Sequence, residues 1–153
     1  MSGAMLHQAV RDILRRVRLD RSHDVPYLAG YSRDGKTIYI DKDLPKTFAA
    51  PGGRRVAVDR YLILHEAVEK ALLDGLGLSY PHAHQIALRA EQAAVRADGV
   101  PCRPYDLFMK RYIKEADDDL GRLPTDLDLK PYRDEHDTQT LRRLQAAGRK
   151  KRG

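Results

Sequence analysis

The stretch YLILHEAVEKALLDGLG, residues 61–77, decides how this chain is interpreted. Leucine, isoleucine and valine recur through it at helical spacing, which predicts a single helix. Three ionisable side chains, His65, Glu66 and Glu69, interrupt the apolar residues. Charged side chains are rarely buried without a partner, so a largely enclosed helix must bring a partner to them. A metal ion is the partner that best fits their spacing.

The helical phase of these three residues follows from the sequence. Successive residues of an α-helix turn by about 100°, so Glu69 falls about 40° and Glu66 about 100° from His65. Leu62, before them, and Leu72, after them, lie on the same side of the helix. The imidazole and the two carboxylates therefore sit inside or beside an apolar stripe, where a solvated charged face is a poor explanation for them.

The run His65-Glu66-Ala67-Val68-Glu69 resembles the metal-binding helix of the zincin metallopeptidases, which reads H-E-x-x-H. In that family the two histidines bind zinc and the intervening glutamate is the general base. The resemblance implies that His65 and Glu69 are metal ligands and that Glu66 is catalytic. This chain departs from the family pattern because a carboxylate stands at the second ligand position. Glutamate is an accepted zinc ligand, and two histidines with one glutamate form a known catalytic set.

The third ligand is expected from the next helix, which the sequence predicts between Ser79 and Gly99. His84 falls on the apolar stripe of this helix together with Glu91, whereas His82 falls on the opposite side among arginines. Helical phase therefore selects His84 as the ligand and leaves His82 at the surface. Glu91 is a candidate second-shell carboxylate that could orient a ligand histidine. His136 is a weaker alternative to His84.

Two short strands are predicted upstream of the metal helix, within residues 25–45, around an Asp-Gly turn. In zincins an edge strand beside the metal helix holds the substrate in extended form. The resemblance, which covers about residues 25–98, therefore implies that the second strand (Thr37 to Asp41) pairs with an extended substrate. The substrate-binding residues would be Ile38, Tyr39 and Ile40. Residues 46–58, with a Pro-Gly-Gly sequence, are predicted to form a flexible loop.

The chain of 153 residues is long enough for one domain with a real core. We expect an α+β fold, a small mostly antiparallel sheet packed on a helical core, zincin-like in arrangement. The domain would span residues 1–137, with an amphipathic N-terminal helix, the two central helices and two further helices. Residues 138–153 would form a basic C-terminal helix or tail.

The composition indicates a cytoplasmic protein. No run approaches the length of apolar sequence that spans a membrane, so no membrane contact is expected. The amphipathic start of the chain lacks the hydrophobic centre of a secretion signal. A single cysteine, Cys102, excludes an internal disulfide and fits a reducing compartment.

The net charge of +6 comes entirely from the C-terminal segment. From residue 138 onward the chain carries six basic residues and no acid, which leaves residues 1–137 formally neutral. The body of the protein thus lacks the general basic bias of a nucleic-acid-binding domain. The tail alone could give weak, salt-sensitive contact with nucleic acid.

The favoured hypothesis is a zinc-dependent metallopeptidase, a hydrolase with Zn²⁺ as cofactor and a peptide or protein as substrate. A second hypothesis is a non-catalytic adaptor with a zincin-like frame. Its buried carboxylates would be held in ion pairs, and its basic tail would bind nucleic acid or a protein partner. A third is a metal-dependent hydrolase that shares the site but cleaves a bond other than a peptide.

Overall fold

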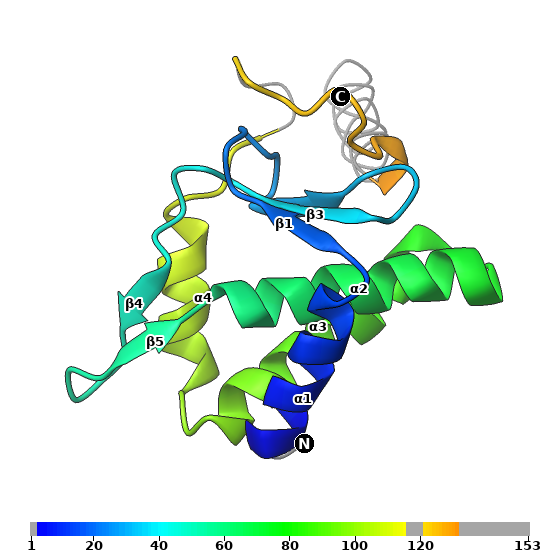
Figure 1. The fold of residues 1–153 in the computed structure, drawn as a ribbon. Helices are drawn as coiled ribbons and strands as arrows, with labels where there is room; N and C mark the ends of the chain where they lie inside the picture. The colour runs from blue at the N-terminus through cyan, green and yellow to red at the C-terminus, as the bar shows by residue number, and fades with distance from the viewer. Residues whose placement is uncertain (1–2, 116–120, 132–153) are drawn as a thin grey trace, which may run out of the picture.

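The computed structural model describes residues 3–115 and 121–131. It has an α+β fold, as predicted, with helices and short strands mixed along the chain (Figure 1). In order, the elements are α1 (Gly3–Leu14), β1 (Arg18–Asp20), β2 (Ala29–Tyr31), β3 (Thr37–Ile40), β4 (Thr47–Ala49), β5 (Arg55–Ala57), α2 (Asp59–Leu76), α3 (Tyr80–Ala97) and α4 (Cys102–Lys110).

The first sheet has three strands in the order β1-β3-β2. β2 and β3 form the expected antiparallel pair, with Gly30 opposite Tyr39. The turn between them includes Gly35 at φ 72°, a left-handed conformation that glycine adopts without a steric penalty. β1 adds to the other side of β3 in parallel, with Leu19 opposite Ile38. The local sequence did not predict β1, because its pairing depends on a partner strand far along the chain.

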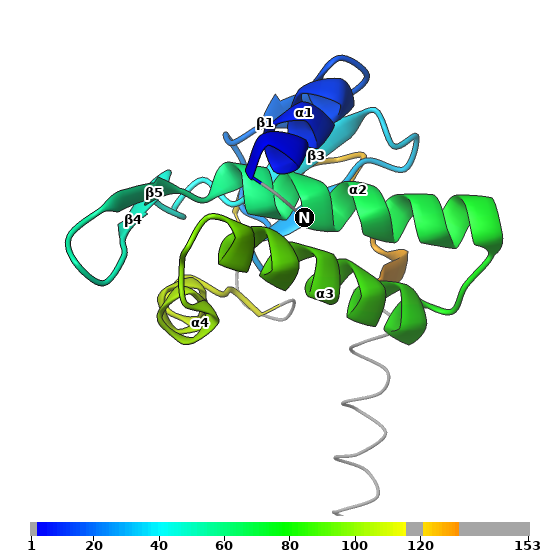
Figure 2. The same ribbon diagram turned by 90° about the horizontal axis from the view of Figure 1, so that it is seen from below.

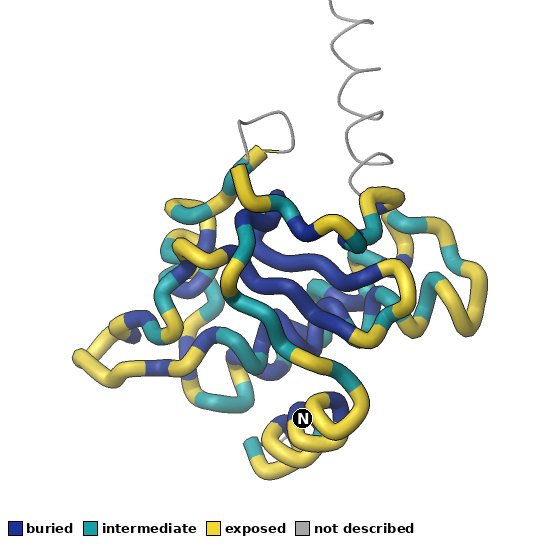
Figure 3. The backbone as a smooth tube through the Cα atoms, turned by 45° about the horizontal axis from the view of Figure 1, so that its top comes forward, coloured by how far each residue is buried: buried dark blue, intermediate teal, exposed yellow. Residues whose placement is uncertain are grey.

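The addition of β1 overturns one prediction about the substrate. β3 is the central strand, hydrogen-bonded to β1 on one side and to β2 on the other. It has no free edge, so the prediction that Ile38, Tyr39 and Ile40 pair with an extended substrate is wrong. All three residues are buried, and β3 and β2 are the dark central strands of Figure 3.

The two central helices lie side by side under the sheet and run in opposite directions (Figure 2). At the start of α2, Arg21 holds the Asp59 carboxylate through two hydrogen bonds of 2.7 and 2.6 Å. α2 ends at Gly77, whose φ of 62° lets its N–H bond back to the carbonyl of Leu72. Ser79 and Pro81 then start α3, as predicted. Because the turn is so short, α3 packs directly along α2.

Residues 46–58, predicted to be a flexible loop, contain a β-hairpin. β4 and β5 pair in antiparallel register, with Phe48 opposite Val56 and both side chains buried. Only the tip, Pro51 to Gly53, is an exposed turn rather than strand. The alternating apolar residues on either side of the glycines were the signal for a hairpin.

One core holds these elements together, because α1, the first sheet, the hairpin and the three later helices all contribute buried apolar residues to it. The largest of its fully buried side chains are Tyr61, Tyr105, Leu6, Ile40, Leu44, Val58 and Val95. Among the described helices, none has the length and apolarity needed to cross a bilayer. The predicted domain boundary at residue 137, the C-terminal segment 138–153 and His136 lie outside the described residues.

Candidate metal centre

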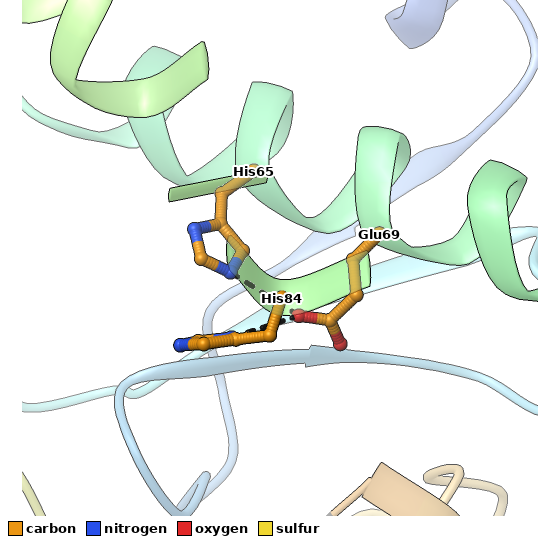
Figure 4. Close-up of side chains that lie close together, drawn as sticks. All are labelled: His65, Glu69 and His84. Atoms are coloured by element: carbon orange, nitrogen blue, oxygen red, sulfur yellow. Dashed lines mark hydrogen bonds and ion pairs between the residues drawn. The ribbon is translucent and has the colours of Figure 1, made fainter. Parts of the chain in front are cut away.

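His65 and Glu69 from α2 meet His84 from α3 in the space between the two helices (Figure 4). Nε2 of His65 lies 3.2 Å from Oε2 of Glu69. Nδ1 of His84 lies 3.1 Å from the same oxygen. The two imidazole rings stand 5.0 Å apart between centroids. The three residues thus present one ligand atom each, all within 4.8 Å of one another.

These distances suit a small divalent cation. Zinc binds nitrogen and oxygen at about 2.0–2.1 Å, so the ligand atoms of a tetrahedral site stand about 3.3 Å apart. The separations from Glu69 to each histidine, 3.2 and 3.1 Å, are close to that value. Only a modest approach of the two imidazoles is needed to complete the set. Two imidazoles and one carboxylate are also a donor set that zinc accepts.

A second carboxylate fixes the orientation of the His65 ring. Nδ1 of His65 lies 2.7 Å from Oε1 of Glu91, and the Tyr105 hydroxyl donates to Oε2 of Glu91 over 2.7 Å. An ionised carboxylate only accepts, so Nδ1 carries the hydrogen and donates it. Nε2 faces Oε2 of Glu69, and it is the nitrogen that would bind an ion once its own proton is released. The structure thus brings Glu91 to the place where a second-shell carboxylate acts.

Tyr31, on β2, holds the other oxygen of Glu69. Its hydroxyl donates a hydrogen bond to Oε1 over 3.1 Å, which leaves Oε2 for the two histidines. Burial, together with the charges of Glu69 and Glu66, raises the pKa of Tyr31, so the hydroxyl keeps its proton and remains a donor. Sequence reasoning missed Tyr31 and Tyr105. No local pattern marks their hydroxyls, because the carboxylates that they contact lie 38 and 14 residues away in the sequence.

Glu66 lies beside this group but takes no part in its hydrogen bonds. Its side chain is buried, and no hydrogen bond to its carboxylate occurs within the described residues. Burial, followed by the charge of Glu69, raises its pKa from 4.5 to about 8. Glu66 also lines the same pocket as His65, Glu69 and His84. It is therefore a buried carboxyl group that is open to the pocket and able to exchange a proton near neutral pH.

The charges of the centre favour a cation. Glu66, Glu69 and Glu91 are all buried, and no lysine or arginine is buried anywhere in residues 3–115 and 121–131. Burial disfavours charge on Glu69, but hydrogen bonds from His65 and His84 overcome that effect and lower its pKa to about 2. Burial likewise opposes the proton on His65, but Glu69 and Glu91 raise the pKa of the ring well above its ordinary value. Glu69 thus stays ionised within the buried centre, as a carboxylate that binds a cation must be.

A pocket of about 360 Å³ opens onto the centre. The five residues His65, Glu66, Glu69, His84 and Glu91 form one part of its wall. The apolar part of the remaining wall comes from β2 and the segment before it, from the three later helices and from the segment after α4; it includes Leu28, Gly30, Leu62, Leu88, Met109 and Ile113. Asp106, Lys110 and Asp128 add charged side chains to the lining. Ile38, Tyr39 and Ile40 do not reach it. His82 is exposed, as helical phase predicted.

Comparison with protein-family models, with curated proteins and with solved structures finds no match to this chain. What the centre can do must therefore be judged from its own residues and their geometry.

Proposed function

We propose that this protein is a zinc-dependent peptidase whose metal ligands are His65, Glu69 and His84. The observation that carries the proposal is the meeting of these three ligand atoms beside the carboxyl group of Glu66, in a single pocket. A structural ion-pair network accounts for His65, Glu69 and Glu91, but Glu66 forms no hydrogen bond within residues 3–115 and 121–131 and lines the pocket instead. Catalytic use accounts for a carboxyl group at this position.

Two of the three proposed ligands are held in position by a further residue. His65 binds through Nε2 while Glu91 holds its Nδ1–H, and Glu69 binds through Oε2 while Tyr31 holds its Oε1. Zinc held by three protein side chains supplies Lewis-acid polarisation of a carbonyl group and activation of water. Tyr31 and Glu91 are positioning residues, since they act through the ligands.

Glu66 is the proposed general base. Its carboxylate takes a proton from the attacking water while the water oxygen bonds to the carbonyl carbon of the substrate. When the carbon–nitrogen bond breaks, Glu66 gives that proton to the leaving amine. A bound cation nearby favours the carboxylate form that the first step requires. The apolar wall of the pocket would receive a substrate side chain next to the cleaved bond.

The proposed arrangement is zincin-like in having a metal helix, α2, beneath a small sheet and a ligand from the following helix. It differs from the family pattern in using Glu69 in place of a histidine and in having β3 enclosed by two other strands. β3 therefore has no free edge with which to pair an extended substrate in the way that the family resemblance implied.

Elemental analysis of the purified full chain, loaded with zinc and desalted, tests the metal site. We expect stoichiometric zinc in the wild type and its loss in His65→Ala and in His84→Ala. His82→Ala is the matched control, because His82 is exposed on the same helix as His84, and it should keep the metal. Wild-type protein without stoichiometric zinc, or equal zinc in all three variants, contradicts the proposal.

Hydrolysis is tested separately with unfolded casein, whose fragments are separated and identified by mass spectrometry. We expect zinc-loaded wild type to produce new amino termini and the chelator-treated protein to produce none. If the protein binds zinc but leaves casein intact, the proposed metal centre stands and the proposed peptidase activity is refuted for this substrate class.

A further inference from the structure

The outer edge of β4 lies in the hairpin at one end of the molecule (Figure 1). β4 pairs with β5 alone. The N–H of Val58 bonds to the carbonyl of Lys46. In an antiparallel pair, residues that bond to the neighbouring strand alternate with residues that do not. The N–H and C=O groups of Thr47 and Ala49 therefore point away from β5. No backbone or side-chain hydrogen bond uses them within the described part of the chain.

This edge borders a groove of about 590 Å³ that separates β4 from α4. Figures 1 and 2 show the hairpin and α4 as neighbours at one end of the molecule. Phe48 packs against Phe108 with ring centroids 5.2 Å apart, which forms an aromatic floor. Leu107 adds an apolar side chain that is 52% exposed. An open strand edge thus runs beside an apolar helix face, the geometry in which extended peptides bind by strand addition.

The charge of the groove is one-sided. Arg55, Arg103 and Arg111 line it and are exposed, and its lining includes no aspartate or glutamate. Three arginines around an apolar floor favour a ligand that carries carboxylates next to apolar side chains. They disfavour the chain's own C-terminal segment, which has six basic residues and no acid from residue 138 onward.

We propose that the groove between β4 and α4 binds an extended segment of another protein, apolar at alternate positions and acidic at its ends. The segment adds to the Thr47–Ala49 edge as a third strand, its apolar side chains lie on Phe48, Leu107 and Phe108, and its carboxylates meet the arginines. The groove shares no lining residue with the metal pocket, so the inference stands independently of the peptidase proposal. A nucleic acid would satisfy the arginines but would leave the strand edge unpaired.

The test uses the full-length chain and a fluorescein-labelled peptide, EEVTVTVEE, followed by fluorescence anisotropy. The comparison peptide KKVTVTVKK keeps the strand and reverses the charge. We expect saturable binding of the acidic peptide that weakens as salt is added, and no binding of the basic one. In a ¹H–¹⁵N correlation spectrum, the amides of Thr47 and Ala49 should shift most.

Ala49→Pro tests the strand edge. Proline removes the outward N–H of Ala49 without breaking a bond to β5, and we expect affinity to fall about tenfold or more. Ala57→Pro is the matched control, since it removes an N–H from the opposite, outer edge of β5. It should leave affinity unchanged. Circular dichroism checks that both variants fold.

The double variant Arg103→Glu/Arg111→Glu tests the charge and should abolish binding. Arg89→Glu/Arg96→Glu, at exposed positions of α3 outside the groove, makes the same charge change and should bind normally. Failure of the acidic peptide to bind, equal binding of the basic peptide, or equal losses in Ala49→Pro and Ala57→Pro would overturn the proposal. A labelled oligothymidylate tests the nucleic-acid alternative. The proposal is also overturned if this oligonucleotide binds tightly, loses its binding in Arg103→Glu/Arg111→Glu, and the acidic peptide does not bind.

Discussion

Glu91 on α3 accepts the Nδ1 hydrogen of His65 on α2 over 2.7 Å, across a separation of 26 residues in the sequence. This single contact fixes which nitrogen of the imidazole faces Glu69 and His84. Tyr105 in turn fixes Glu91 by donating to its second oxygen. The orientation of the candidate metal ligand is therefore set by two residues that do not touch the metal position themselves.

Removal of this support should weaken zinc binding. We expect Glu91→Gln to lower zinc affinity about 10–100-fold, because an amide is a poorer partner for Nδ1–H and does not raise the basicity of the ring. Tyr105→Phe should have a smaller effect of the same sign. Competition with a chromophoric chelator measures both affinities. Gln85→Ala, exposed on the same helix, is the control; wild-type affinity in Glu91→Gln would show that Glu91 has no role at the centre.

The proposed base is tested by Glu66→Gln. This change keeps the shape of the side chain and removes its ability to take a proton, so turnover should fall about 10²–10⁴-fold. Zinc content should stay as in the wild type, because Glu66 is not a proposed ligand. Asp74→Asn, exposed on the same helix, should be fully active. Casein hydrolysis and elemental analysis on the same samples give both readouts, and an active Glu66→Gln protein would remove Glu66 from the mechanism.

The same variant makes a separate prediction for the metal-free protein. Burial raises the pKa of Glu66 from 4.5 to about 8, so the folded state holds a proton that the unfolded state has released. The stability associated with this proton is complete below pH 4.5 and is lost as the pH rises towards 8, by at most about 1.4 kcal/mol per pH unit. The Glu66→Gln variant has no ionisable group at this position, so its stability does not fall with pH for this reason.

Urea unfolding of chelator-treated wild type and Glu66→Gln across this pH range measures the difference. The variant should become the more stable of the two as the pH rises, and the gap should widen towards pH 8. Two curves that stay parallel would mean that the carboxyl group of Glu66 ionises normally in the folded state.

A cluster around Lys114 should govern acid stability. Its Nζ lies 2.7 Å from Asp24, 3.0 Å from Asp41 and 2.6 Å from Asp43. Hydrogen bonds from Lys114 lower the pKa of Asp24 and of Asp43, so their stabilisation is present above the ordinary value of 3.8 and is lost as the pH falls below it. We expect Lys114→Met to lower the melting temperature at neutral pH and to make it less sensitive to acid.

Thermal melts of wild type and Lys114→Met at several pH values test this cluster. Lys46→Met, which removes an exposed lysine near the hairpin, controls for the loss of charge and should melt like the wild type. The prediction fails if Lys114→Met keeps the neutral melting temperature of the wild type or loses stability in acid to the same extent.

The helices and the phase of the candidate ligands on them could be predicted because they depend on near neighbours in the sequence. The choice of His84 over His82 required only the turn per residue, and the structure places His82 at the surface. The end of α2 at Gly77 and the start of α3 after Ser79 likewise follow from local capping signals.

The sheets could be predicted only in part. The Asp-Gly turn predicted the pairing of β2 with β3, but nothing near residues 18–20 indicates that they lie parallel to β3. That one pairing turned the supposed edge strand into the central strand. The hairpin of β4 and β5 was missed because glycines at its tip also suit a loop.

The sequence by itself determined which faces of the two central helices are apolar and which ionisable side chains those faces carry, because these features repeat within a few residues. Only the tertiary structure decided that Tyr31, 38 residues from Glu69, holds one of its oxygens, and that Tyr105 donates to Glu91, the carboxylate that helical phase had selected. Contacts of this kind depend on how distant segments pack, and side-chain hydroxyls and carboxylates leave no periodic signal of their partners in the chain.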